Sequence, residues 1–119
     1  MVCTSYYQNV KKLKEAGFEL VSISRSAPPW FTGQRIEALA PTWEMLKMSD
    51  EDYEKNYEKM LQKVNPCAIM ELFEGRNVAL VCWEKDRNQC HRKRVAEWLN
   101  ENGYNVREFG ESYDQLTLF

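Results

Sequence analysis

The stretch Val78-Ala79-Leu80-Val81-Cys82-Trp83 (VALVCW) decides the fold class. A short, continuously apolar run is typical of a central strand in a parallel sheet, because helices cover both faces of such a strand. The sequence predicts that a helix follows over residues 88–102 and ends at Gly103. A buried strand followed by a helix is the repeating unit of layered α/β folds.

The rest of the chain repeats this alternation of strands and helices. The pattern predicts further strands over residues 2–5, 19–24 and 105–109, and further helices over residues 8–16, after Ser49, and after Asn65-Pro66. Pro28 and Pro29 cannot continue the strand before them, so a long loop is expected up to Thr42. We therefore expect a small three-layer α/β sandwich with a mostly parallel sheet. It forms one domain over residues 1–110, with a C-terminal tail over residues 111–119.

Length and composition limit the function classes. The chain has 119 residues, of which 44% are hydrophobic and 29% charged, so one domain with a real core is expected. A net charge of -2 gives no global attraction for nucleic acid or anionic membranes. No apolar run approaches the ~20 residues that a membrane helix needs. The first residues lack the features of an export signal, and a cytoplasmic location is expected.

The four cysteines are Cys3, Cys67, Cys82 and Cys90. Their spacing follows no disulfide framework, and free thiols are expected in a reducing compartment. The paired spacings of a structural zinc site are also missing. The sequence therefore predicts neither a metal nor a cofactor.

Candidate site residues follow two of the predicted strands. Ligands of open α/β sheets bind beyond the carboxyl ends of the strands, where Ser24-Arg25-Ser26 and Cys82–Lys85 are expected. Arg25 offers a planar fork for a phosphate or carboxylate. Cys82 is a candidate nucleophile or an inert core thiol, and Glu84 is a candidate acid or base.

The helix that follows adds His91 and Arg92. His91 shares an apolar face with Val95, Trp98 and Leu99, so it is expected to point inward, towards the strand end and Glu84. It is either a buried histidine with a structural partner or a working acid or base. Basic side chains gather nearby, either as a solvated face or as a landing site for a phosphate-bearing partner: Lys85, Arg87, Arg92, Lys93 and Arg94. We expect Arg25, Glu84, His91 and Arg92 to converge in one crevice.

Tryptophans near loops and strand ends are candidate walls of that crevice. Trp30 follows two prolines and is the best candidate for a pocket wall or a platform on which a base stacks. The alternative is that Trp30 packs in the core, as most tryptophans do.

An apolar strand ending in Cys82-Trp83-Glu84, then Cys90-His91-Arg92 and an amphipathic helix, resembles the signature of the domain of unknown function 488 family. Thr4-Ser5-Tyr6, Ile23-Ser24-Arg25 and the helix with Tyr53 and Tyr57 extend the resemblance over nearly the whole chain. It implies a compact α/β sandwich with the motif residues Cys82, Glu84, Cys90, His91 and Arg92, but no particular reaction. Many members have an Asp-Val-Arg type strand end where this chain has Ser24-Arg25, so any role of that acid is missing or moved here.

The tail Gln115-Leu116-Thr117-Leu118-Phe119 resembles the short peptide by which bacterial polymerases and repair proteins dock on the sliding clamp. Leu116, Leu118 and Phe119 would fill apolar pockets and Gln115 would form hydrogen bonds. The alternative is that these side chains pack back on the domain. If the tail docks on a clamp, the protein is bacterial or phage-borne.

Three functional hypotheses remain open at this point. The first is an enzyme acting on a phosphate-bearing or nucleic-acid substrate in DNA maintenance. The second is a non-catalytic adaptor that docks on the clamp. The third is a purely structural motif, in which Glu84, His91 and Arg92 lock the junction between strand and helix.

Overall fold

The computed structural model describes residues 1–83 and 91–110 of the chain. The described strands are β1 (Val2–Tyr6), β2 (Glu19–Ser22), β3 (Val78–Cys82) and β4 (Arg107–Glu108). The α-helices are α1 (Val10–Glu15), α2 (Asp50–Gln62), α3 (Pro66–Glu71) and α4 (His91–Glu101). Three short 3-10 turns complete the set: η1 (Tyr7–Asn9), η2 (Glu37–Leu39) and η3 (Met45–Lys47).

The four strands form one sheet in the order β2-β3-β1-β4, and every described pairing is parallel. All five residues of β3 are buried, which confirms the prediction of a central strand covered on both faces. The pairing sets Tyr6 beside Cys82 and Thr4 beside Glu108. The carboxyl ends of β1, β2 and β3 therefore meet at one edge of the sheet, which we call the carboxyl edge.

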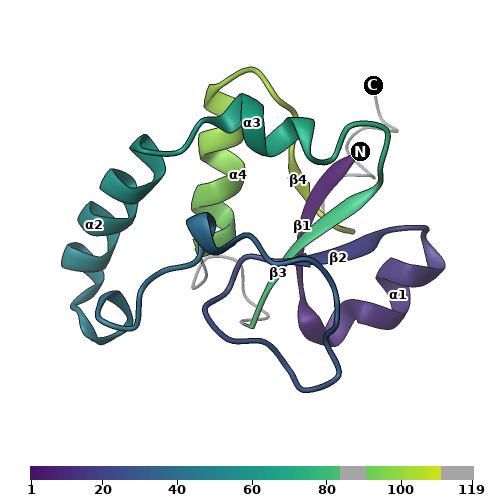
Figure 1. Cartoon of the computed structure of the whole chain (residues 1–119), viewed down its shortest axis with the longest axis horizontal. Helices are drawn as coiled ribbons and strands as arrows, with labels where there is room; N and C mark the ends of the chain where they lie inside the picture. Colours follow the sequence, from purple (N-terminus) through teal and green to yellow (C-terminus); the bar gives the residue numbers. More distant parts are fainter. Residues whose placement is uncertain (84–90, 111–119) are drawn as a thin grey trace.

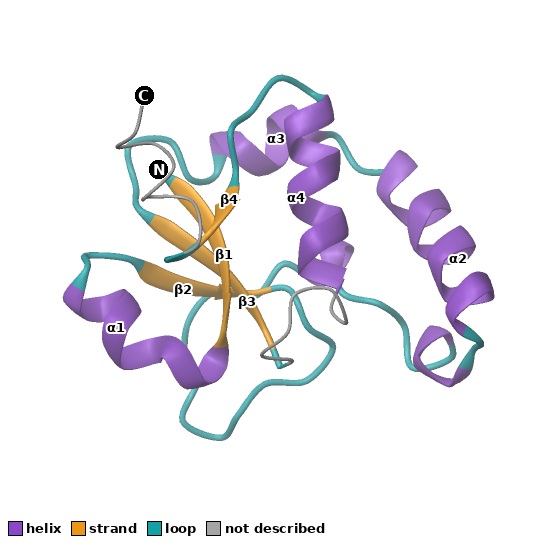
Figure 2. Ribbon diagram, turned by 180° about the vertical axis from the view of Figure 1, so that it is seen from behind, coloured by secondary structure: helices purple, strands orange, loops and turns teal. Residues whose placement is uncertain are grey.

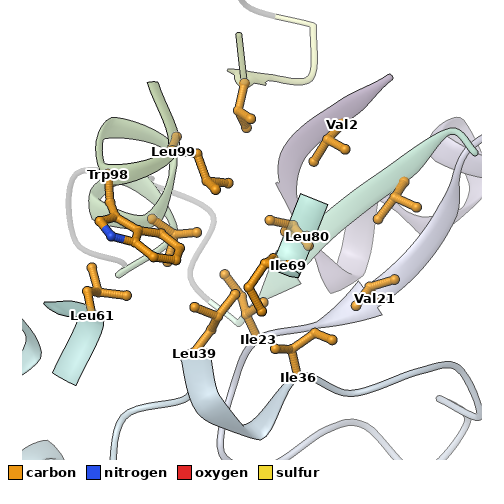
Figure 3. Packing of buried hydrophobic residues seen from close by; sticks show 14 of the residues in the cluster. Val2, Val21, Ile23, Ile36, Leu39, Leu61, Ile69, Leu80, Trp98 and Leu99 are labelled. Carbon is orange, nitrogen blue, oxygen red and sulfur yellow. The ribbon is translucent and has the colours of Figure 1, made fainter. Parts of the chain in front are cut away.

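Helices cover the two faces of the sheet unequally, with α1 on one side and α2, α3 and α4 on the other (Figures 1 and 2). The side chains of β3 alternate between two apolar clusters. Val78 and Leu80 face the larger cluster, and Ala79 and Val81 face the smaller one, which contains Leu13 of α1. Figure 3 shows the larger cluster, where Leu80 of the sheet packs with Trp98 and Leu99 of α4. The expected three-layer α/β arrangement is confirmed.

Local signals account for most helix ends. The Ser49 side chain accepts a hydrogen bond from the Asp52 amide at the start of α2, as the hydroxyl cap predicts. Asn65 accepts from the Cys67 amide at the start of α3. Gly103 follows α4 with φ 94, a left-handed conformation that favours glycine.

The structure differs from the sequence predictions at several boundaries. The predicted strand over residues 19–24 ends at Ser22, and the Ile23 amide makes one further bond to β3, at the Val81 carbonyl. The expected helix over residues 8–16 divides into η1 and the shorter α1. The last strand contains only Arg107–Glu108, because only these residues pair with β1. Short or frayed elements carry too weak a periodic pattern for their ends to be read from the sequence.

Candidate functional site

Arg92, at the start of α4, is fully buried at the carboxyl edge and paired with a carboxylate of this chain. Its Nε and Nη2 donate to the two carboxylate oxygens of Glu108 at 2.9 to 3.2 Å. Thr4 donates to the same carboxylate at 2.6 Å, and Nη1 of Arg92 donates to Cys82 Sγ at 3.2 Å. The guanidinium lies 5.8 Å from the centre of the Tyr6 ring. These contacts tie α4 to β1, β3 and β4.

The sequence predicts that Arg92 contacts a substrate, and this role stays a prediction. The structure shows an internal partner, Glu108, that the sequence reasoning missed. Glu108 is 8% exposed. The signal was present in the expected strand over residues 105–109. Alternation that buries Val106 also turns Glu108 inward, and an inward acid needs a charged partner.

His91 lies against the segment that follows β2. Its Nε2 is 2.6 Å from the Ile23 carbonyl oxygen, and its ring meets the Tyr57 ring edge-on at 5.5 Å. The pKa of His91 is lowered to about 4, mainly by burial; the hydrogen bond with Ile23 opposes the shift, and the positive charge of Arg92 adds to it. The imidazole is therefore neutral at pH 7. The expected inward orientation is confirmed, and the partner found is a backbone carbonyl.

Cys82, the candidate nucleophile, is buried and disulfide-bonded. The prediction of free thiols is confirmed for Cys3 and Cys67 and is wrong for Cys82. Whether two cysteines can bond depends on the distance and direction of their side chains in the fold, which sequence spacing does not give. A sulfur held in a disulfide has no thiolate, so nucleophilic attack by Cys82 requires prior reduction. Burial raises the pKa of Cys3 to about 12, which makes that thiol unreactive as well.

Arg25 lies just beyond β2 and is half-buried. Its Nε donates to the Pro41 carbonyl at 2.9 Å and its Nη2 to the Ala40 carbonyl at 3.0 Å. No carboxylate forms an ion pair with Arg25 within residues 1–83 and 91–110. Main-chain carbonyls therefore fix the orientation of this guanidinium without cancelling its charge.

Aromatic side chains gather on the α1 side of the carboxyl edge. The Tyr7 ring meets the rings of Trp30, Phe31 and Trp83 at centroid distances of 6.2, 5.7 and 5.0 Å. We call these four residues the aromatic cluster. Trp30 was singled out in the sequence, whereas Phe31 and the central role of Tyr7 were missed. An aromatic residue directly after a strand, as at Tyr7, was the available signal.

A family model described as the active DUF488-N3 subclade, DUF488-N3a, matches residues 10–103. The chain belongs to this subclade. The family resemblance seen in the sequence is confirmed. Searches of curated proteins and of solved structures found no match.

Part of the predicted site of this DUF488-N3a protein lies outside the described residues. This applies to Glu84, Lys85, Arg87 and Cys90 of the motif region and to Gln115, Leu116, Leu118 and Phe119 of the tail. Four residues are expected to converge in one crevice. One of them, His91, contacts Ile23, which lies two positions before Arg25 in the sequence. Arg92 is the residue after His91, so three of the four lie around the end of β2 and the start of α4. Convergence with Glu84 stays a prediction.

Metal-binding side chains do not cluster in the part of the DUF488-N3a chain that is described. No group of three or more His, Cys, Asp or Glu side chains is placed to hold an ion there. Among the same residues, no helix is long and apolar enough to cross a membrane.

Proposed function

We propose that this DUF488-N3a protein is an enzyme that acts on a phosphate-bearing substrate, a nucleic acid, bound at the carboxyl edge of the sheet. The observation that carries the proposal is the half-buried guanidinium of Arg25, whose charge no described carboxylate balances. The description of the subclade as active supports catalysis, although it names no reaction. Ligand binding beyond the carboxyl ends of parallel strands is the general rule for such sheets.

Arg25 is suited to a phosphate because its fork is already oriented. Two carbonyls hold Nε and Nη2, so little side-chain freedom is lost when an anion binds to the remaining N–H groups. Arg35 adds a second positive charge nearby, since its Nη2 donates to the carbonyls of Ser24 and Arg25. Two adjacent arginines favour an anionic ligand even though the net charge of the chain is negative.

The motif residues divide into supporting and reacting groups in this proposal. His91 and Arg92 support the site, because their described contacts join α4 to the ends of β2 and β4. Glu84 is the candidate for proton transfer. Glu84→Gln is then expected to abolish turnover while leaving substrate binding unchanged.

Arg25→Gln is expected to weaken binding of an oligonucleotide about tenfold at low salt. The plot of log Kd against log salt should also lose about one unit of slope, because one phosphate contact disappears. Fluorescence anisotropy of a labelled oligonucleotide measures both quantities. Arg76→Gln is the matched control, since Arg76 lies before β3 at the opposite edge and pairs with Glu19. Equal salt slopes for the wild type and the Arg25 variant would contradict the proposal.

A second candidate function, docking on a bacterial sliding clamp, is supported by the sequence Gln115-Leu116-Thr117-Leu118-Phe119. In this proposal the protein is an adaptor in DNA maintenance, and the ring on DNA raises its local concentration. The tail binds the clamp, and the folded domain is brought to DNA with it. This adaptor is non-catalytic and is the alternative to the enzyme, and the two proposals are tested on different parts of the chain.

The full chain is expected to bind purified bacterial clamp more tightly than about 1 mM, as measured by calorimetric titration. Replacing Gln115, Leu118 and Phe119 by alanine should weaken binding at least about tenfold, because each buried apolar anchor contributes on the order of 1–3 kcal/mol. Asp114→Ala is the control and should bind as the wild type does. Equal binding by the triple variant would remove the clamp from the list of partners.

A further inference from the structure

Two tryptophans of the aromatic cluster are unusually exposed for residues in contact with a buried ring. Trp30 is 50% exposed and Trp83 is 41% exposed, whereas Tyr7, which touches both, is 1% exposed. Large aromatic side chains usually bury most of their surface, so half-exposed indoles around a fixed ring form a surface feature that needs an explanation.

Hydrogen bonds hold this surface in place. The Trp83 indole N–H donates to the Ser26 carbonyl at 2.9 Å, and the Ser26 hydroxyl lies 3.3 Å from the same nitrogen. The Tyr7 hydroxyl is bonded to the hydroxyls of Ser22 and Ser24 at 2.6 and 2.5 Å. The polar atoms of Tyr7 and Trp83 therefore have partners inside the protein. What Trp83 offers to solvent is ring carbon in a fixed orientation.

We infer that Trp30 and Trp83 form a stacking site for an unpaired base of a single-stranded nucleic acid. The inference rests on the proposed function and names its substrate class more closely. Fixed aromatic rings lose little conformational entropy on binding, and every base presents a π-face to them.

The position of the arginines supports a nucleic acid strand as the occupant. Ser26, which holds the Trp83 indole, follows Arg25 directly, and the Arg35 guanidinium bonds to the carbonyl of Arg25. A backbone phosphate on Arg25 or Arg35 and a base on the aromatic cluster thus need only a short stretch of one strand. Binding of single strands generally combines such positive charge with aromatic platforms.

Exposure of the two indoles favours a strand over a free mononucleotide. Sites for small ligands bury most of the ligand surface, whereas a surface platform leaves one side of the base open. A paired base does not offer its face, so duplex nucleic acid is not expected to use the cluster.

The test is binding of a short fluorescein-labelled single-stranded oligonucleotide to the full chain, by anisotropy and by quenching of indole fluorescence. Trp30→Ala and Trp83→Ala are each expected to weaken binding about tenfold. Trp30→Phe, which keeps a ring face, should recover most of the affinity. Trp43→Ala is the matched control, because Trp43 is 59% exposed and does not belong to the cluster. Thermal melting of each variant checks that the domain remains folded.

The outcomes separate this inference from the proposed function. Loss of affinity in the tryptophan variants, with duplex of the same sequence bound more weakly and indifferent to them, supports the stacking site. If Arg25→Gln weakens binding and both tryptophan variants bind normally, the stacking site is overturned and the proposed function stands. If a mononucleotide quenches the indoles but the oligonucleotide does not bind, the assignment to a single strand is overturned. Absence of binding to either ligand overturns both proposals.

Discussion

Arg92→Met is expected to lower the melting temperature by about 12–20 °C. The substitution leaves the carboxylate of Glu108 buried without the guanidinium that binds both of its oxygens. Removing one member of a buried ion pair costs about 3–5 kcal/mol, and in a domain of this size each kcal/mol lowers the melting temperature by about 4 °C. Circular dichroism melting at pH 7 measures the change.

A double variant and a surface pair serve as controls. Arg92→Met combined with Glu108→Met removes both charges and should recover at least half of the lost stability, because well-packed apolar residues replace such pairs at little cost. Arg94→Ala breaks the ion pair between Arg94, whose side chain is 27% exposed, and Glu58, whose side chain is 44% exposed. The loss of this surface pair should cost less than about 1 kcal/mol. A melting temperature of Arg92→Met within a few degrees of the wild type would show that the buried pair does not lock α4 to the sheet.

The sequence was sufficient for the elements whose pattern is strong. The apolar run from Val78 to Cys82 predicts a central strand because a parallel sheet buries both faces of its inner strands. The Ser49 cap and Asn65-Pro66 predict two helix starts because each satisfies amides or φ angles locally. The placement of Arg25 and His91 around the carboxyl edge follows from the alternation of strands and helices alone.

Partners that are distant in the sequence could not be predicted in the same way. Glu108 meets Arg92 only because β4 pairs with β1, and no periodic pattern in the sequence reveals the order of strands. The same holds for Tyr7, whose hydroxyl bonds to Ser22 and Ser24 of a different segment. Sequence patterns report which side of an element is apolar, whereas the site depends on which elements are neighbours.

The second large effect is expected from acid. The pKa of His91 is about 4 in the folded protein, mainly because the ring is buried, and about 6.5 in the unfolded chain. At a pH between these values the ring is neutral in the folded state and protonated in the unfolded state. Between these values the unfolded state binds more protons, so the free energy of unfolding falls as the pH falls from about 6.5 to about 4. The shift corresponds to about 3 kcal/mol. Urea unfolding at a series of pH values measures this loss, and NMR titration of the ring gives the pKa directly.

His91→Gln isolates this contribution, because His91 is the only histidine of the chain. The variant removes the titrating ring, so its stability should change much less between pH 6.5 and pH 4 than that of the wild type. Salt-bridged carboxylates also affect stability at low pH. The hydrogen bonds with Arg76 and Arg94 lower the pKa of Glu19 and Glu58 from 4.5, and the stability gained there is lost as the pH falls below that value. Both proteins share that loss, so the difference between their curves reports His91. Parallel curves for the two proteins would mean that the imidazole accepts a proton in the folded state, and that burial beside Arg92 does not keep it neutral.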